Sequence, residues 1–162
     1  MIVESYLAFH LISAMMHGPP IIREDIVKNN NEYRCAVRNL YHEARGESLL
    51  GQAYVLKTVL NRVRDTKHPH SVCAVIYQNK QFSWTHNLPK NKQQVPQKTT
   101  SEKELLKQLE ALSTVVIWVD RFGFDFTNNS KYYHNLNVKP IWRYRLKRTK
   151  VVGNHVFYKE KT

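Results

Sequence analysis

Apolar residues recur at intervals of three and four along two neighbouring stretches of the chain. In residues 33–44 they form one stripe, which predicts an amphipathic helix that Asn31 caps and that Gly46 ends. A second stripe over residues 49–63 predicts another helix, which begins near Ser48. The short stretch between them predicts a helix-turn-helix pair, with Gly46 in the left-handed conformation just past the first helix.

Shorter patterns predict the remaining elements. Residues 71–77 match one or two buried helical turns, and residues 81–85 are typical of a short exposed strand or lip. Ser101 and Glu104 have the spacing of a capping box, which predicts a long helix after them. Residues 151–156 predict two strands around a Gly-Asn hairpin turn. We therefore expect an α+β fold that is mainly α, with a small β-hairpin.

Two segments lie outside this pattern. Residues 1–16 are apolar but contain Glu4 and His10, lack a basic leader and are shorter than a membrane span of about 20 residues, so they predict an amphipathic core helix. Residues 86–100 are rich in Asn, Lys, Gln, Pro and Thr, which predicts a surface loop or a flap. The whole chain, residues 1–162, is expected to be one domain.

Composition narrows the class of partner. The 162 residues are 42% hydrophobic, which suits one domain with an ordinary core. The 25 Lys and Arg residues outnumber the 13 Asp and Glu residues, and the net charge of +12 favours an anionic polymer or surface as partner. Nucleic acid, anionic lipid and bacterial wall material all remain open. Cys35 and Cys73 lack the spacing of a zinc site, and the sequence leaves open whether they form a disulfide.

The densest polar cluster is YHEARGE, residues 41–47, at the end of the first predicted helix. Glu43 flanks the apolar stripe, so we expect it to be half-buried. Burial and the negative end of the helix dipole both raise the pKa of a carboxyl group. A carboxyl group that stays protonated can act as a general acid on a leaving oxygen. The alternative is an ordinary ion pair with Arg45 or Lys57.

Two other chemistries are conceivable for this cluster. His42 and Glu43 resemble the start of the zinc-peptidase helix motif, but that motif needs a histidine where this chain has Gly46, so we expect no metal. Glu47 has two interpretations: the second carboxylate of a two-carboxylate glycosidase, or a side chain that bonds the backbone at the helix-helix turn. Gly46 interrupts the helix between the two acids, so spacing does not decide.

Several separated blocks resemble, in order and spacing, the SleB-type cell-wall hydrolase family of the spore-cortex-lytic enzymes, from about residue 33 to residue 158. The blocks are CAVRNLYHEARGE (35–47), GQ (51–52), VLNRV (59–63), VCAVIYQ (72–78), QFSW (81–84) and GNHVFY (153–158). The resemblance implies a lysozyme-like, lytic-transglycosylase-like domain that acts on peptidoglycan glycan strands without a cofactor. It implies that Glu43 is the catalytic acid, and it leaves residues 1–30 as an N-terminal helical extension.

Polar groups and aromatic faces stabilise the flattened sugar of an oxocarbenium-like transition state, and two segments offer both. The predicted substrate-binding residues are Glu47, Gln81, Phe82, Ser83, Trp84, Tyr132, Tyr133 and His134. Phe82 and Trp84 have the core as an equal alternative, and Trp142 is expected to pack rather than bind.

Three alternatives to a lytic transglycosylase remain open. The first is a muramidase-type hydrolase in which water attacks, and the second is a wall-binding protein with an inactive site. The third is a basic nucleic-acid-binding protein, but the sequence has no zinc finger, RRM signature or recognition helix, so we expect no specific nucleic acid.

The basic residues also bear on location. Residues 139–161 carry a run of Lys and Arg with Glu160 as their one acid, which favours attraction to an anionic cell-envelope surface. We expect a monomer that is made in the cytoplasm without a signal peptide. It would reach the cell wall after release, as a bacteriophage endolysin does.

Overall fold

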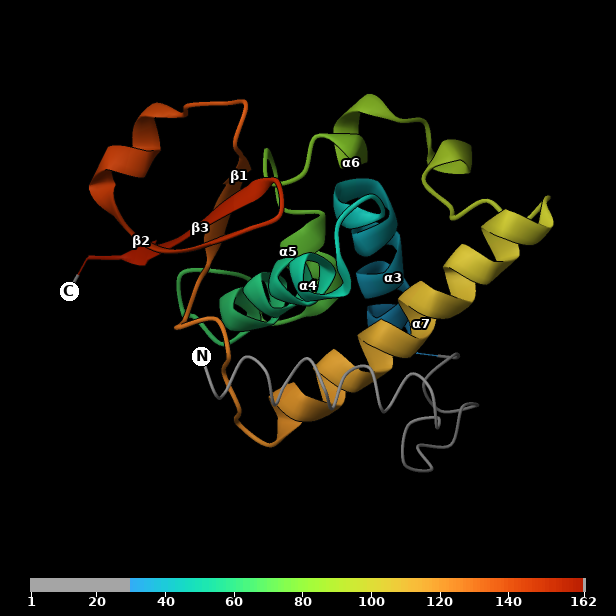
Figure 1. Cartoon of the computed structure of the whole chain (residues 1–162), viewed down its shortest axis with the longest axis horizontal. Coiled ribbons are helices and arrows are strands. Elements are labelled where there is room, and N and C mark those ends of the chain that lie inside the picture. The colour runs from blue at the N-terminus through green and yellow to red at the C-terminus, as the bar shows by residue number, and fades with distance from the viewer. Residues whose placement is uncertain (1–29, 162) are drawn as a thin grey trace.

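The computed structural model describes residues 30–161, and the rest of the chain is drawn as a grey trace in Figure 1. The helix predicted for residues 1–16 lies outside the described residues. The helices are α3 (Asn31–Ala44), α4 (Leu49–Val63), α5 (Val72–Ile76), α6 (Trp84–Asn87) and α7 (Thr100–Arg121), with 3-10 helices η1 (Lys90–Lys92) and η2 (Ile141–Arg145). The strands are β1 (Tyr132–Asn135), β2 (Leu146–Val152) and β3 (His155–Glu160).

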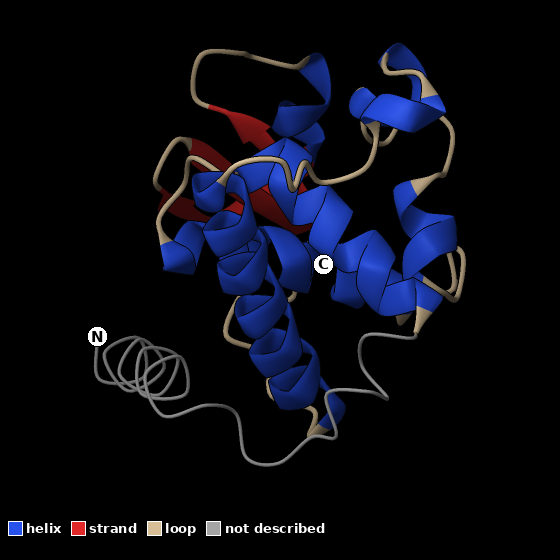
Figure 2. Cartoon of the chain, turned by 90° about the vertical axis from the view of Figure 1, so that its right-hand side faces the viewer, coloured by secondary structure: helices blue, strands red, loops and turns tan. Residues whose placement is uncertain are grey.

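Helix α4 is the centre of the molecule. Its residues from Gly51 to Arg62 are all buried, because α3, α5 and α7 pack around it and β2 contacts it as well. A helix buried on nearly every side must satisfy its polar side chains inside the protein, as Lys57 and Arg62 do. The sheet lies beside this helical body, as Figure 2 shows from a second direction. None of the helices within residues 30–161 combines the length and the apolar character that crossing a bilayer requires.

The predicted helix pair is confirmed, with one correction at the turn. Asn30 caps α3, one residue before the predicted cap, and Ser48 caps α4 by accepting a hydrogen bond from the Gly51 amide. Gly46 is not left-handed: the described glycines with positive φ are Gly123 and Gly153. The chain leaves α3 through a right-handed turn, in which the Glu47 amide donates to the carbonyl of Ala44.

A three-stranded antiparallel sheet of order β1-β3-β2 replaces the simple hairpin that we expected. The predicted hairpin of β2 and β3 is confirmed, and Gly153 takes φ +54 in its turn. The additional strand β1 pairs with β3, and its residues alternate between the two faces. Tyr133 points to the face where Phe157 packs on Tyr54 of α4. His134 points to the opposite face, where Trp142 of η2 covers it.

Two local predictions were wrong. Residues 81–85 do not form a strand: α6 begins at Trp84, whose indole donates to Asn39 Oδ1 and stacks on His42, so the segment is fixed by packing into the helices. The capping box of α7 is made by Thr99 and Glu102 rather than by Ser101 and Glu104. The required spacing occurs twice in this stretch, and the chain uses the earlier pair.

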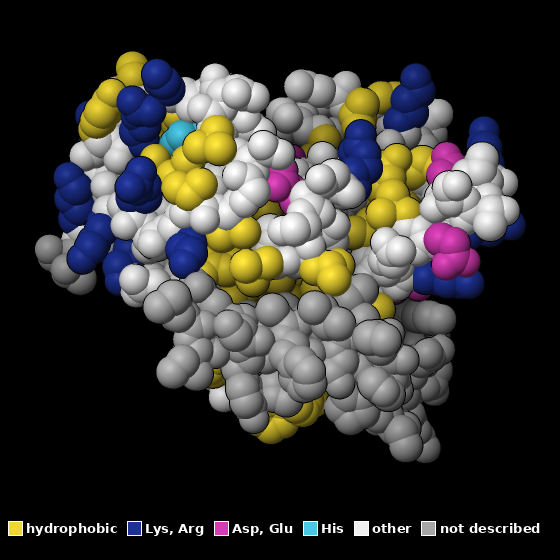
Figure 3. All heavy atoms as spheres, in the orientation of Figure 1, with side chains coloured by type: hydrophobic (Ala, Val, Ile, Leu, Met, Phe, Trp, Pro, Cys, Tyr) yellow, Lys and Arg dark blue, Asp and Glu magenta, His cyan; other side chains and the backbone are white. Residues whose placement is uncertain are grey.

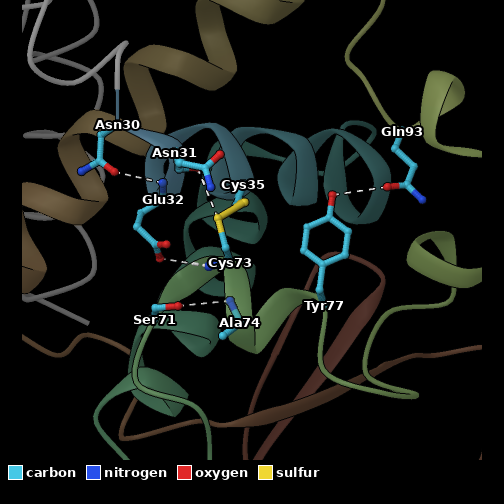
Figure 4. Close-up of a disulfide and its surroundings, with 9 residues drawn as sticks. All are labelled: Asn30, Asn31, Glu32, Cys35, Ser71, Cys73, Ala74, Tyr77 and Gln93. Atoms are coloured by element: carbon cyan, nitrogen blue, oxygen red, sulfur yellow. Dashed lines mark hydrogen bonds between the residues drawn. A yellow bond between two sulfur atoms is a disulfide. The ribbon is translucent and has the colours of Figure 1, made fainter.

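A disulfide joins Cys35 of α3 to Cys73 of α5, with the two Cα atoms 5.3 Å apart. Figure 4 shows this bond next to a hydrogen bond from the Cys73 amide to Glu32 Oε2, at 3.0 Å. The short helix α5 is therefore held on α3 by a covalent bond and by a carboxylate at its first turn.

A buried lysine ties α4 to the segment that leads into β1. Lys57 is fully buried, and its Nζ lies 2.9 Å from Asp120 Oδ1, 3.6 Å from Asp125 Oδ1 and 2.6 Å from Asn61 Oδ1. Asp125 also accepts hydrogen bonds from the amide and the hydroxyl of Thr127. This network fixes the loop between α7 and β1 against the central helix.

Candidate active site

The last turn of α3 brings Glu43 against β1. Its side chain is half-buried, as predicted, and the hydroxyl of Tyr133 donates to its Oε2 across 2.9 Å. The tyrosine comes from the strand that the sequence did not predict. In the space-filling view, an acidic side chain reaches the surface between the sheet side and the α6 side of the molecule (Figure 3).

The surroundings of Glu43 favour its protonated form. Burial raises the pKa of Glu43 above its ordinary value, and this effect outweighs the opposing effects of the Tyr133 hydrogen bond and the Arg62 charge. Burial and the neighbouring Glu43 hold the pKa of Tyr133 well above its usual range, so the phenol remains a donor. The direction of the pKa shift of Glu43 is the one that its position on the helix leads us to expect.

The alternative ion pairs of Glu43 do not form. Lys57 instead forms ion pairs with Asp120 and Asp125. Arg45 donates to the carbonyl of Tyr41 and lies over its ring. The carboxyl group of Glu43 is therefore left with a neutral hydrogen-bond donor, which is the arrangement a general acid needs.

Arg62 of α4 connects the two walls of the site. It is buried, donates through Nη1 to Gln81 Oε1 at 3.0 Å and through Nε to the carbonyl of Lys131. Its guanidinium also lies over the ring of Tyr132, at 5.6 Å from the centroid. Sequence reasoning missed this role, because the pattern of a helix does not distinguish a buried arginine from an exposed one.

Glu47 binds the hairpin rather than the turn between the helices. Its carboxylate accepts 3.0 Å hydrogen bonds from the amide and from the side chain of Asn154, and lies 3.9 Å from Nδ1 of His155. Burial opposes ionisation of Glu47, but the Asn154 hydrogen bonds and the His155 ring outweigh it and lower its pKa. Glu47 therefore joins the turn between α3 and α4 to the hairpin of β2 and β3, and these contacts favour its ionised form.

The aromatic residues predicted to bind sugar in the segment 81–84 lie in the core. Phe82 and Trp84 are only 3% and 5% exposed, so their faces are not open to a sugar ring, which corrects the expectation that they line a cleft. Gln81 is half-buried and held by Arg62, whereas Ser83 is exposed at the start of α6. These two remain on the surface of the segment that Arg62 fixes.

Of the predicted residues Tyr132, Tyr133 and His134, only Tyr133 contacts Glu43. His134 is buried on the outer face of the sheet, where Nε2 lies 2.9 Å from the hydroxyl of Tyr158, so its prediction as a substrate-binding residue is corrected. Tyr132 shares that outer face and donates to Glu160 Oε1. Trp142 packs against His134 and Tyr158, which confirms that it is a packing residue.

The described residues offer no ready metal site. Within residues 30–161, no group of three or more His, Cys, Asp or Glu side chains is arranged to hold an ion. His42 is instead engaged with the carbonyl of Gln93 and stacked on Trp84. The chemistry available around Glu43 is that of a carboxyl group, a phenol and a buried guanidinium.

This chain is similar in sequence to known proteins. The family model for the Cell Wall Hydrolase family matches residues 46–158. The spore cortex-lytic enzyme of Bacillus cereus is 26% identical over 151 residues, which cover 91% of this chain and 52% of that protein. Its counterpart in Oceanobacillus iheyensis is 25% identical over 88% of this chain and 46% of its own length. The chain thus spans about half the length of these curated relatives.

Two solved structures also match. The catalytic domain of the germination-specific lytic transglycosylase SleB from Bacillus anthracis superposes with a TM-score of 0.62 at 26% identity, over 80% of this chain and 95% of that one. The catalytic domain of Bacillus cereus SleB gives 0.56 at 28% identity, over 80% and 90%. These matches confirm the predicted mainly helical fold with a small sheet. Since the family match also covers well over half of the sequence, the chain belongs to the cell wall hydrolase family.

Proposed function

We propose that this chain cleaves the β-1,4 bond between MurNAc and GlcNAc in peptidoglycan as a lytic transglycosylase, with Glu43 as its acid and base. The observation that carries the proposal is a half-buried carboxyl group whose pKa is raised by burial and whose only polar side-chain contact among the described residues is a phenol. Membership of the cell wall hydrolase family and the likeness to a lytic transglycosylase domain support it.

In the first step the protonated Glu43 donates its proton to the oxygen that links MurNAc C1 to GlcNAc. The C1–O bond breaks as this proton arrives, and the sugar ring develops oxocarbenium character. GlcNAc leaves with the proton on its O4. The Glu43 carboxylate that remains is stabilised by the hydrogen bond from Tyr133, which favours the charged form.

In the second step the Glu43 carboxylate acts as a base. It takes the proton from the C6 hydroxyl of MurNAc, and O6 then bonds to C1 to give a 1,6-anhydro end. The proton that Glu43 lost is restored, and no water is consumed. If water takes the place of the C6 hydroxyl, the same carboxylate activates it and the product is the hydrolysed sugar of a muramidase.

The neighbouring residues support this one-acid mechanism. Tyr133 holds the carboxyl group and Arg62 joins the two walls around it, so both are positioning residues. Gln81 and Ser83 are the polar side chains we propose for contact with the glycan strand. Glu47 is ionised and bonded to Asn154, so it holds the hairpin in place and does not share the proton transfer.

The test is Glu43→Gln assayed on purified sacculi, with mass spectrometry of the released muropeptides. The amide keeps the size of the side chain but has no proton to donate, so glycan cleavage should fall by roughly 10²–10⁴-fold while the fold is kept. Glu104→Gln is the control, because Glu104 is an exposed acid on α7 and should leave the rate unchanged. Retained cleavage in Glu43→Gln would end the assignment.

The same spectra separate the two reaction outcomes. A muropeptide lighter by one water than the hydrolysed product identifies the anhydro end of a transglycosylase, and the heavier product identifies a muramidase. The nucleic-acid-binding alternative has no support from the comparisons. A monomer that acts on the wall after endolysin-like release stays a prediction, which size-exclusion chromatography and cell fractionation test.

A further inference from the structure

The 3-10 helix η2 exposes apolar side chains on the side of the sheet that faces away from α4. Ile141 is 82% exposed and Tyr144 is 68% exposed. Trp142, between them in sequence, is 38% exposed and packs on Tyr158, so the tryptophan holds η2 against the sheet. The turn therefore presents an isoleucine and a tyrosine to solvent, the tyrosine with the Arg143 guanidinium over its ring.

Basic side chains lie on the same side as these two residues. Exposed ones are Lys139 just before η2, Arg145 in η2 and Arg148 in β2, which pairs with Tyr158 and so shares its outer face. Lys147 and Lys150 pair with Lys159 and Phe157 and point to the other face of the sheet. The one acid in this part of the sequence, Glu160, is engaged by Lys131 at 3.2 Å and by Tyr132 at 3.0 Å. Figure 3 shows Lys and Arg side chains gathered on this side of the molecule, with apolar side chains at its outer end.

This surface does not overlap the candidate active site. The sheet separates the two, because Tyr133 points from one face of β1 to Glu43 while Tyr132 and His134 point to the face that η2 covers. A partner on the η2 side can therefore be held while a ligand occupies the Glu43 side.

We propose that Ile141 and Tyr144, with Lys139, Arg145 and Arg148, form a docking surface for an anionic lipid bilayer. Lys and Arg near a bilayer are attracted to anionic headgroups, and exposed apolar and aromatic side chains insert at the interface. A hydrophilic polyanion would use the same cations but would leave Ile141 and Tyr144 without a contact. The apolar pair therefore favours the bilayer.

Vesicle co-sedimentation with the full chain tests the proposal. The probes are vesicles of mixed phosphatidylglycerol and phosphatidylcholine, and vesicles of phosphatidylcholine alone. Wild type should bind the anionic vesicles. Ile141→Ser/Tyr144→Ser keeps the net charge and should weaken binding roughly tenfold or more. Lys139→Gln/Arg145→Gln/Arg148→Gln should weaken it on the order of a hundredfold.

Matched controls lie elsewhere on the molecule. Phe122→Ser removes an aromatic ring that is 73% exposed at the end of α7, and should leave binding unchanged. Lys90→Gln/Lys92→Gln/Lys103→Gln removes the same charge as the basic triple variant from exposed positions outside the surface. Thermal melts of all variants test whether the fold is kept.

Three results would overturn the proposal. The first is that wild type ignores anionic vesicles. The second is that the serine double variant binds as wild type does, which would leave charge alone as the attraction to any polyanion. The third is that the controls lose as much binding as the surface variants. Cleavage of purified sacculi, which contain no bilayer, should be unchanged in both surface variants, so a failure of docking is distinct from a failure of the proposed function.

Discussion

Tyr133 donates a hydrogen bond to Glu43 across 2.9 Å, and so links the last turn of a helix to a strand ninety residues further along the chain. The contact both fixes the direction of the carboxyl group and lowers a pKa that burial raises. Tyr133 therefore sets where Glu43 points and also the pH at which it loses its proton.

Tyr133→Phe should move the high-pH limb of the cleavage rate. Because the hydrogen bond favours the ionised carboxylate, its removal raises the pKa of Glu43 further. The protonated acid then persists to higher pH, so the limb shifts upward while the maximal rate falls through poorer positioning. Tyr132→Phe is the control, since its hydroxyl bonds Glu160 on the other face. A pH profile that keeps the wild-type limb would show that the phenol does not tune Glu43.

Glu43→Gln should stabilise the folded chain at neutral pH. The folded pKa of Glu43 is raised above the ordinary value of 4.5, so folding disfavours the ionised group. The contribution of Glu43 to stability is thus fully present below that value and is lost as the pH rises through the raised pKa. The neutral amide avoids this loss. Urea denaturation at several pH values should give a stability gain at pH 7 that shrinks at acidic pH; a gain independent of pH would contradict the account.

Gly153→Ala should disrupt the hydrogen bonds between Glu47 and the hairpin. Gly153 has φ +54, and a Cβ atom there would lie 2.1 Å from Glu47 Oε2. Backbone strain and the displaced carboxylate together should lower the free energy of unfolding by roughly 2–3 kcal/mol. Gly123→Ala isolates the strain, because Gly123 has φ +76 and no atom lies within 4 Å of the added Cβ. Equal losses in the two variants would mean that the Glu47 contact contributes nothing.

Replacing both Cys35 and Cys73 by Ala should destabilise the chain by roughly 3–4 kcal/mol, because the disulfide closes a loop with a sequence separation of 38. Denaturation with and without a reductant measures this: wild type should lose stability in the reductant and the double variant should not respond. Since Cys35 lies near the start of α3 and Glu43 near its end, the folded variant should still cleave peptidoglycan.

The helix pair and the hairpin were predictable because each carries a local signal. Ser48 has the chemistry of a cap, and Gly153 with Asn154 has that of a tight turn. Strand β1 was missed because four residues in an aromatic and basic stretch show no alternation that only a strand would produce. It forms because β3 offers it an edge, and that partner lies far along the chain.

The residues of the site, too, were predictable only where a local sequence signal marks them. Glu43 could be found because its position on an amphipathic helix determines how far it is buried. Arg62 and the Asn154 partner of Glu47 could not be found, since both act through contacts between segments distant in sequence. Phe82 and Trp84 were misassigned because an aromatic pair in a short segment has the same pattern whether it binds sugar or fills the core.

The network around the buried Lys57 should set a lower limit to the pH at which the fold stays intact. Burial opposes ionisation of Asp125, but hydrogen bonds from Thr127 and Asn129 and the Lys57 charge outweigh it and lower its pKa. As the pH falls through that lowered pKa, Asp125 takes up a proton and the Lys57 ammonium loses one of its counterions. We expect the loop that leads to β1 to loosen there, together with the strand that carries Tyr133. Strong acid would therefore disturb the position of Glu43 even while it keeps Glu43 protonated.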